Sequence, residues 1–557
     1  MFLELERRTA GTTINIVHLG SLIREDEEAA QASSADQNFG FYSLFHIAQA
    51  IGELRTSIPI KIGVISNRLH SVTGEEDVAP AMATVLGPCG VIPKEYPNVK
   101  CFNIDFPDSQ PFESLPDEWL ARIISEFAEK HASQVIAYRG KYRWERHFER
   151  VKLNEPLPSA APSETPVIRR LKPGGVYLIT GGTGGLGLAI AGYLAKACRP
   201  RLVLTKKSPF PKKSSWTELA TAADTPPPVL KTITALMEIE RMGAEIEVLV
   251  ADVSDREQMQ TAVDEVFTRY GTINGVIHAA GVVQAGMIQT KTRESADAVL
   301  APKVYGTMIL FDLLRRIKLD FMVLFSSVSS VLTPYAESDY SAANSFLDAY
   351  SCFANAHGGF HTLTINWPGW REVGMLAELE TLPGLEGWKQ DALEKAITTK
   401  DGLDAFRRAL NSSLTQVIVS PEDMEHLLKE SEAVFDPTKY LSQVRPAKRA
   451  FRPSGSQQDR TGEPTNTAET ALADMWSSVF GFERIGIHDN FADLGGHSLL
   501  AMQIVSRIRS LYQMPFTLTD FFEAPTIAQL SSVIQARLLA EIEGLTDEQT
   551  RRLISKD

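Results

Sequence analysis

Cysteine is scarce in this sequence, and long apolar runs are missing from it. The four cysteines among 557 residues stand at positions 89, 101, 198 and 352, and no two of them form a CxxC pair. This spacing argues against a disulfide framework or a zinc site and predicts reduced thiols in a cytosolic protein. No apolar run reaches the about 18 residues that would span a bilayer. The charged stretch Met1–Arg8 has no apolar run behind it, so we expect no signal peptide.

Positive charge is also in short supply. Lys and Arg number 56 against 69 Asp and Glu, which gives a formal net charge of −13 at pH 7. Such a balance argues against nucleic acid or an anionic membrane as the main partner. Hydrophobic residues make up 44% of the chain and charged residues 22%, which suits ordinary globular cores, and 557 residues suggest several domains.

A cluster of glycines follows an apolar stretch at Val176–Gly187, whose sequence is VYLITGGTGGLG. The apolar residues predict a strand, and the pattern from Leu188 to Leu194 predicts a helix directly after the glycines. Glycines at such a turn let the backbone approach a pyrophosphate, and the N-terminus of the helix presents free N–H groups to it. The stretch therefore predicts a dinucleotide-binding turn.

Two lysines follow the next predicted strand, Arg201–Thr205. An acidic residue at this place would accept the 2′-hydroxyl of NAD, whereas Lys206 and Lys207 suit a 2′-phosphate and hence NADPH; a solvated loop is the alternative. Two further strands, Glu245–Asp252 and Gly275–Gly281, supply an acidic residue for the adenine edge and small residues beside the cofactor. The residues expected to bind the cofactor are Thr180, Gly181, Gly182, Thr183, Gly184, Gly185, Leu186, Gly187, Lys206, Lys207, Asp252, Val253, Ala279, Ala280 and Gly281.

Three residue types that together can reduce a carbonyl accompany this turn. Ser327 ends the predicted strand Phe321–Ser327, Tyr340 lies 13 positions further, and Lys303 precedes both. We expect Tyr340 to donate the proton, with its pKa lowered from about 10 by the neighbouring ammonium. We expect Ser327 to hold the carbonyl oxygen while hydride comes from a nicotinamide. Asn344, one helical turn after Tyr340, shares its helix face.

These motifs resemble the ketoreductase domain of modular polyketide synthases, a branch of the short-chain dehydrogenase/reductase superfamily. The resemblance is carried by TGGTGGLG at 180–187, HAAG at 278–281, APKVYG at 301–306, FSSVSS at 325–330, YSAAN at 340–344 and NWPGW at 366–370. In ordinary members of the superfamily the lysine lies four residues after the tyrosine. In the synthase branch that position is asparagine and the lysine lies upstream, as Asn344 and Lys303 do here. The resemblance therefore implies that both belong to the catalytic set.

Two positions bear on stereochemistry in this family. One class carries Leu-Asp-Asp just after HAAG, where this chain has Val283, Gln284 and Ala285. The opposite class has a tryptophan eight residues before the tyrosine, where this chain has Leu332. The missing aspartates favour the second class, which gives the L-configured alcohol.

The first 152 residues alternate strand-like and helix-like segments, which predicts a parallel sheet with flanking helices. The motifs VLGPCGVIPKEYP at 85–97 and AYRGKYRW at 137–144 resemble the structural, non-catalytic half of such ketoreductases. That half normally begins with more strands, so we expect it to be truncated at its N-terminus. Strands are expected at Thr13–Leu19, Ile58–Asn67, Val99–Phe106 and Gln134–Tyr138, and helices at Phe39–Arg55 and Asp117–His131.

A compact helical pattern occupies the end of the chain. Within it, DNFADLGGHSLLAMQIVSRI at 489–508 resembles the prosthetic-group site of acyl or peptidyl carrier proteins, and its LGGHSL form is more typical of peptidyl carriers. The resemblance implies that Ser498 carries 4′-phosphopantetheine, which a separate phosphopantetheinyl transferase attaches. A phosphate ester is favoured at a helix N-terminus. A simple N-cap is the alternative role of Ser498.

The predicted fold class is α/β, with two Rossmann-like parallel-sheet subdomains and a small α-helical carrier bundle. The expected divisions are a structural subdomain (1–152), a linker (153–172), a catalytic subdomain (173–440), a second linker (441–466), a carrier (467–538) and a terminal helix (539–557).

The function implied by the resemblance is NADPH-dependent reduction of a carrier-bound β-ketoacyl thioester to the β-hydroxyacyl thioester, within a polyketide or hybrid peptide–polyketide synthase. The expected partners are the other domains of the synthase, the phosphopantetheinyl transferase and the tethered substrate, with no metal, nucleic acid or membrane. Two alternatives stay open: an α-ketoacyl reductase of a peptide-synthetase module, and a catalytically silent scaffold that presents the carrier.

Overall fold

The computed structural model describes residues 13–22, 37–54, 58–107, 116–128, 134–153, 169–379, 386–432, 462–480 and parts of 482–543. These residues fall into two compact units. The first unit holds the described residues up to 379 together with 392–432, and the second holds 386–391 and the residues from 462 onward.

A five-stranded sheet opens the first unit. Its strands are β1 (Ile14–Ser21), β2 (Ile60–Asn67), β3 (Val99–Phe106), β4 (Val135–Arg139) and β5 (Tyr142–Glu145), in that spatial order. The first four strands are parallel and match the predicted ones within two residues at each end. The last strand, β5, pairs with β4 in the antiparallel direction and was not predicted.

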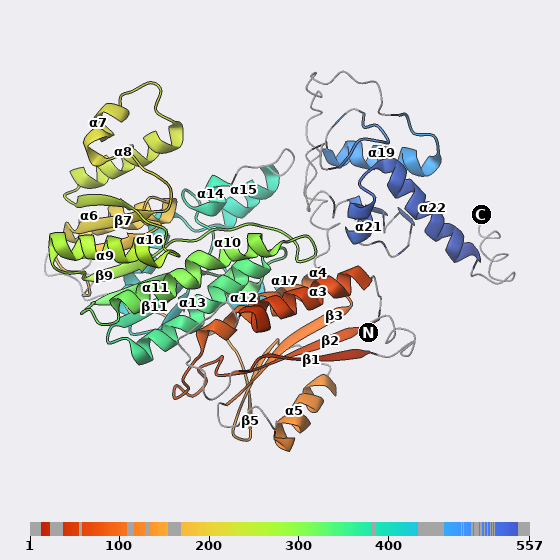
Figure 1. Ribbon diagram of the computed structural model, residues 1–557, viewed down its shortest axis with the longest axis horizontal. Coiled ribbons are helices and arrows are strands. Elements are labelled where there is room, and N and C mark those ends of the chain that lie inside the picture. Colours follow the sequence, from red (N-terminus) through yellow and green to blue (C-terminus); the bar gives the residue numbers. More distant parts are fainter. Residues whose placement is uncertain are drawn as a thin grey trace. The chain divides into compact units, whose positions relative to one another are not determined.

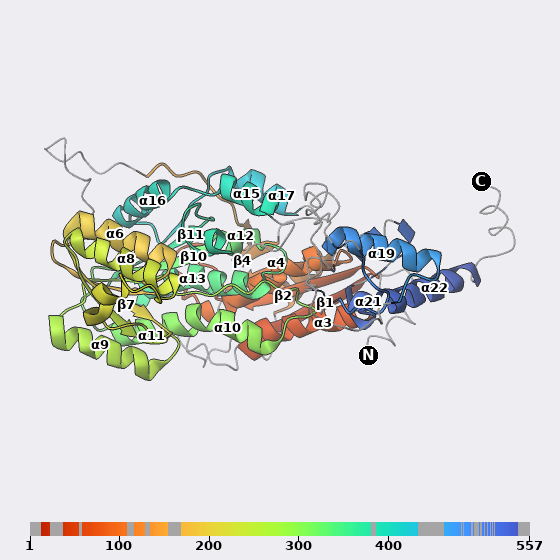
Figure 2. The same cartoon turned by 90° about the horizontal axis from the view of Figure 1, so that it is seen from above.

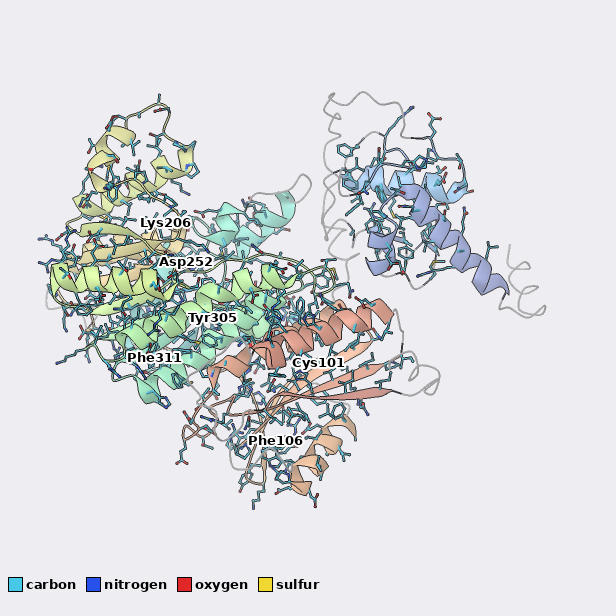
Figure 3. The ribbon with its side chains drawn as sticks, in the orientation of Figure 1. Cys101, Phe106, Lys206, Asp252, Tyr305 and Phe311 are labelled. Atoms are coloured by element: carbon cyan, nitrogen blue, oxygen red, sulfur yellow. The ribbon has the colours of Figure 1, made fainter. Side chains whose placement is uncertain are left out.

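Helices cover both faces of this sheet (Figure 1). Helices α3 (Ser43–Leu54) and α4 (Leu86–Glu95) lie on one face, and α5 (Asp117–Ala128) lies on the other. Alternate residues of β3 serve the two faces, because Cys101 belongs to the core under α4 whereas Phe106 packs with the residues of α5 (Figure 3). The expected alternation of strands and helices is thereby confirmed.

A seven-stranded sheet forms the rest of the first unit. All of its pairings are parallel, and its order is β12-β11-β10-β9-β6-β7-β8. From β6 the strands are added towards one edge of the sheet (β7, β8), and from β9 they are added towards the other edge (β10, β11, β12). Such a switch in strand order, here between β6 and β9, opens a crevice at the carboxyl ends of the strands. The strands are β6 (Val176–Thr180), β7 (Arg201–Lys206), β8 (Glu245–Val250), β9 (Gly275–His278), β10 (Phe321–Ser327), β11 (His361–Trp367) and β12 (Gln416–Ile418).

Two helical layers sandwich the second sheet (Figures 1 and 2). Strand β10 shows why, since Met322 and Leu324 enter one hydrophobic core while Val323 and Phe325 enter the other. One layer consists of α6 (Gly185–Cys198), α8 (Pro227–Arg241) and α16 (Thr399–Asn411), and the other of α9 (Arg256–Tyr270), α10 (Arg293–Lys303), α11 (Tyr305–Leu314) and α13 (Ser338–His357). The shorter helices are η1 (Asn38–Tyr42), η2 (Pro80–Val85), η3 (Lys213–Ser215), α7 (Trp216–Leu219), α12 (Ser329–Leu332), α14 (Met375–Glu378), α15 (Glu386–Lys395) and α17 (Met424–Glu432).

One hydrophobic core joins the two sheets. Ile92 on α4 and Phe346 on α13 are both fully buried in it, as are Ile62 of the first sheet and Met322 of the second. Burial of apolar side chains is the main favourable contribution to folding, so the two sheets stabilise each other. The α/β class with Rossmann-like parallel sheets is confirmed.

The described elements of the second unit are helices. They are α19 (Thr467–Phe480), α21 (Leu518–Glu523) and α22 (Ile527–Glu543), and they enclose a separate core with Trp476 and Phe521 at its centre. Ser498 lies outside the described residues, as do positions 154–168 and 441–461 of the two predicted linkers.

Candidate active site

The predicted glycine turn connects β6 to α6. Gly181 adopts φ +64°, a left-handed conformation that favours glycine. A Cβ added to Gly187 would lie 2.6 Å from the carbonyl oxygen of Gly181, so the turn and the first turn of the helix are too close for any side chain there. The sequence therefore folds this turn tightly because both positions lack a side chain.

The other side of the turn is open. A Cβ added to Gly184, the N-cap of α6, would meet one atom within 4 Å, the carbonyl oxygen of Gly181 at 3.3 Å. The first N–H groups of any α-helix have no partner inside the helix. In α6 these groups belong to Gly185, Leu186 and Gly187. The helix N-terminus is open at Gly184, whereas a Cβ added to Gly185 would lie 2.5 Å from the backbone nitrogen of Gly374. The free N–H groups suit a phosphate, which is a ligand that a helix N-terminus attracts.

Lys206, Lys207 and Asp252 come together beside the ends of β7 and β8 (Lys206 and Asp252 are labelled in Figure 3). The ammonium of Lys207 lies 2.8 Å from the Asp252 carboxylate, and that of Lys206 lies 5.9 Å from the ring centroid of Phe210. Burial acts to raise the pKa of Asp252, but Lys207 and Ser254 outweigh it and the pKa is lowered. Lys207 is thus paired with an acid at the surface, whereas Lys206 has no carboxylate in contact among the ion pairs of the described residues, which favours Lys206 for an added phosphate.

The segment after β9 approaches the predicted lysine closely. A Cβ added to Gly281 would lie 2.7 Å from Cε of Lys303, so a larger residue would displace that side chain. His278, at the end of β9, has Nδ1 2.6 Å from the hydroxyl of Thr180 and Nε2 3.0 Å from the carbonyl oxygen of Pro302. Burial and the charge of Lys303 lower the pKa of His278 to about 3, so the imidazole is neutral.

Lys303 and Asn344 are in direct contact. Both are buried, with the Lys303 ammonium donating to the carbonyl oxygen of Phe325 at 2.5 Å and to Oδ1 of Asn344 at 3.0 Å. Burial lowers the pKa of Lys303 to about 7, although the charge of Asp348 opposes this. Asn344 in turn donates to the backbone carbonyl of Tyr340 at 2.7 Å. The predicted lysine and asparagine therefore form one network with the tyrosine helix.

Tyr340 lies beside this network, but its pKa differs from the expectation. The Lys303 ammonium is 5.7 Å from the centroid of the Tyr340 ring. Burial and the charge of Glu337 raise the pKa of Tyr340 to about 12, while Ser327 and Asn344 act to lower it. The expected lowering by the lysine is thus wrong for this structure, because the ammonium is directed at other acceptors and burial raises the pKa of the phenol.

Ser327 belongs to a chain of hydroxyls that ends on a carboxylate. Its hydroxyl donates to Oγ of Ser329 at 3.2 Å and accepts from the Ser329 backbone N–H at 3.1 Å. The hydroxyl of Ser329 donates to Glu337 at 3.0 Å. Ser327, Tyr340 and Asn344 are close enough that the side chains of the first and third both affect the pKa of the second.

Several ionisable groups near this cluster were not predicted from the sequence. Lys291 and Asp339 form a buried ion pair at 2.6 Å, and the Asp339 carboxylate also accepts from the backbone N–H of Tyr340 at 2.8 Å. Asp348, further along the same helix, accepts from Ser330 at 2.6 Å. The position of Asp339 directly before Tyr340 was a usable signal, whereas its pairing with Lys291 depends on the tertiary fold.

A cavity of ≈ 340 Å³ lies between the two sheets and borders this cluster at Asp348. Its lining includes His70, Arg146 and Asp348 but none of the predicted catalytic or cofactor-binding residues. The candidate active site is therefore the side-chain cluster at the carboxyl ends of the strands. Among the described residues, no group of three or more His, Cys, Asp and Glu side chains could hold a metal ion, and no helix is long and apolar enough to cross a membrane.

Two family descriptions match parts of the chain. Residues 175–372 match the KR domain, and residues 470–534 match the phosphopantetheine attachment site. The first match contains the glycine turn and the cluster around Tyr340, and the second contains Ser498.

Curated relatives are larger than this chain. Polyketide synthase PksM of Bacillus subtilis (strain 168) is 28% identical over 425 residues, which cover 75% of this chain and 9% of the relative. The 6-methylsalicylic acid synthase of Aspergillus terreus is 26% identical over 499 residues, which cover 85% of this chain and 26% of the relative. The chain thus spans about a quarter or less of the length of either relative.

Solved structures are similar to about three quarters of this chain. An N-terminal ketoreductase from the macrolactin assembly line has a TM-score of 0.59 at 28% identity, over 77% of this chain and 77% of that one. A ketoreductase domain from the bacillaene assembly line has a TM-score of 0.57 at 25% identity, over 75% of this chain and 94% of that one.

Proposed function

We propose that this chain is an NADPH-dependent ketoreductase that acts on a carrier-bound β-ketoacyl thioester. The chain carries the KR and carrier domains of a polyketide synthase. The observation that carries this proposal is the contact of Lys303 with Asn344, whose amide also holds the backbone of Tyr340. This network lies at the carboxyl ends of the strands beside the glycine turn, where open α/β sheets bind their ligands.

The residues of the glycine turn fit a dinucleotide. The open helix N-terminus at Gly184–Gly187 would hold the pyrophosphate, Lys206 the 2′-phosphate, and Asp252 with Val253 the adenine edge. Ala279, Ala280 and Gly281 would line the same crevice without filling it. When bound, a reduced nicotinamide supplies the hydride for the carbonyl carbon.

Tyr340 would donate the proton that the new alkoxide needs, and Ser327 would orient the carbonyl oxygen by donating its hydroxyl hydrogen. Burial and the charge of Glu337 raise the pKa of Tyr340 to about 12, which keeps the phenol protonated at neutral pH but makes it a weaker acid. Lys303 lies 5.7 Å from the Tyr340 ring and would stabilise the phenolate that remains after the transfer. Asn344 would hold the lysine in place.

The carrier would deliver the substrate. Ser498, which stands in the stretch matched as a phosphopantetheine attachment site, would carry 4′-phosphopantetheine added by a phosphopantetheinyl transferase. The ketoacyl chain would reach the reductase on this arm, and the other domains of the synthase would supply it and take the product. The absence of Leu-Asp-Asp at Val283–Ala285 favours the L-configured alcohol.

The first prediction tests the proton donor. Tyr340→Phe removes the donating hydroxyl and should lower the rate of NADPH oxidation with a β-ketoacyl thioester by at least about 10²-fold, a typical contribution of a general acid. NADPH binding should remain, because the glycine turn is unchanged. The measurement is absorbance at 340 nm, with fluorescence titration for binding. Tyr142→Phe, which alters a tyrosine that is 61% exposed on β5, is the matched control and should keep full activity.

Three results would contradict the proposal. Unchanged turnover in Tyr340→Phe would remove that residue from the mechanism. Preference for an α-ketoacyl over a β-ketoacyl thioester would assign the chain to the peptide-synthetase type of reduction. An inactive wild-type protein, even with the substrate loaded on phosphopantetheinylated Ser498, would support a silent scaffold.

A further inference from the structure

One face of α4, a helix of the first sheet, rests on the segments that surround Tyr340. This α4 contact face consists of Gly87, Gly90, Lys94 and Glu95. The first three lie three and four residues apart and therefore on one side of the helix. A Cβ added to Gly87 would lie 2.5 Å from the backbone nitrogen of Ala342, so the helix sits directly on the first turn of α13.

Lys94 and Gly90 hold the loop between α12 and α13. The Lys94 ammonium donates to the carbonyl oxygens of Leu332 at 2.5 Å and of Thr333 at 3.0 Å. A Cβ added to Gly90 would lie 2.5 Å from the side chain of Thr333. The start of the loop is therefore held by the hydrogen bonds of the Lys94 ammonium and by the close packing of Gly90 against Thr333.

Glu95 joins two loops at once. One oxygen of its carboxyl group accepts from the backbone N–H of Ile288 at 2.8 Å, and the other accepts from that of Ala336 at 3.2 Å. The two loops also touch each other, since the N–H of Gly286 donates to the carbonyl oxygen of Ala336 at 2.9 Å. Segments 283–288 and 332–337 follow strands β9 and β10, so both lie at the carboxyl end of the sheet where substrate is expected.

The loop that α4 holds is strained. Thr333 has φ +39° and Ala336 has φ +62°, a left-handed region that non-glycine residues seldom occupy. Such conformations persist where the surroundings over-determine them, and they cluster at functional sites. Here Lys94 holds the first strained residue and Glu95 holds the second.

We propose that the α4 contact face shapes the wall of the substrate cleft, so that Lys94 and Glu95 are positioning residues that determine which face of the ketone meets the hydride. This inference rests on the proposed reductase function. It gives the first sheet a part in specificity as well as in stability.

The test combines product analysis with hydrogen exchange. Glu95→Gln and Lys94→Met should each lower the ratio of major to minor alcohol at least fivefold and raise KM more than they lower kcat. Lys94→Arg, which keeps the donors, should retain most of the ratio. Glu75→Gln and Lys100→Met are exposed changes in the same part of the chain and should alter neither value. In Glu95→Gln, the amides of Ile288 and Ala336 should exchange faster, as measured on peptides covering 284–290 and 332–338.

An unchanged alcohol ratio in folded, active Glu95→Gln and Lys94→Met would overturn the proposal, as would unchanged exchange in both loops. If Glu95→Gln does not fold, as judged by its melting temperature, Lys94→Met decides the question alone. A wild-type protein without reductase activity would refute the proposed function. The exchange measurement would then still decide whether α4 holds the two loops.

Discussion

The Lys303 ammonium has two acceptors in the folded protein, the carbonyl oxygen of Phe325 and the side chain of Asn344. Asn344 was selected by its position one helical turn after Tyr340 and Lys303 by its position in APKVYG, and the resemblance to synthase ketoreductases implied a catalytic role for both. The sequence did not predict the electrostatics. The pKa of Tyr340 is raised to about 12 where a lowering was expected, since burial depends on packing that the sequence does not display.

At the same scale, Lys303 should make stability depend on pH. Its pKa is about 7 in the folded protein and near 10.5 in the unfolded chain. Between these values the unfolded chain binds more protons, so the free energy of unfolding contributed by this group rises as pH rises from 7 towards 10.5. Lys303→Met should remove this rise, which amounts to roughly 2 kcal/mol between pH 7 and 9.

Urea unfolding of wild type and variant at both pH values measures this difference. Lys100→Met, an exposed lysine on β3, should show the pH dependence of the wild type. Parallel curves for wild type and Lys303→Met would show that the buried amine does not titrate in this range.

At the scale of elements, hydrophobic periodicity predicted the first four strands and the long helices α3 and α5 to within a few residues. It also placed β6 and α6 around the glycine turn. Strands β5, β11 and β12 were missed. Strand β5 is exposed along its length and β12 has three residues, so neither shows a clear buried pattern, whereas β11 is almost wholly buried and was left without an assignment. The contacts of α4 with the loops around Tyr340 could not be predicted, since they join residues more than 190 positions apart.

The helix α6 offers a matched pair of glycines. Gly187→Ala should destabilise the protein by about 1–3 kcal/mol and weaken NADPH binding, because its Cβ would lie 2.6 Å from the Gly181 carbonyl oxygen. Gly192→Ala in the middle of the same helix has its nearest neighbour at 3.8 Å. It should stabilise the protein by about 0.5–1 kcal/mol through the unfolded chain. Thermal unfolding and a cofactor titration distinguish the two; equal behaviour would contradict a tight turn.

At the scale of the whole molecule, the described side chains form a core shared by the two sheets and a separate core in the second unit. Ile92→Ala, in the shared core, should lower the free energy of unfolding of the first unit by about 2–5 kcal/mol. The transition of the second unit should stay where it is. Leu472→Ala, in the separate core, should do the reverse. Ile124→Ala, at a residue that is 68% exposed, is the control and should move neither transition. Calorimetry that found both transitions moving together in either core variant would refute the division into two separate cores.

The shared core also bears on the order in which a ribosome makes the protein. Helix α4 is complete at residue 95, whereas its partner α13 begins at residue 338. At about 5–20 residues per second, the interval between them is on the order of 10–50 s. Throughout that time the apolar side chains of α4 lack their packing partners on α13. We therefore expect the nascent chain to need shielding by chaperones until α13 has left the exit tunnel.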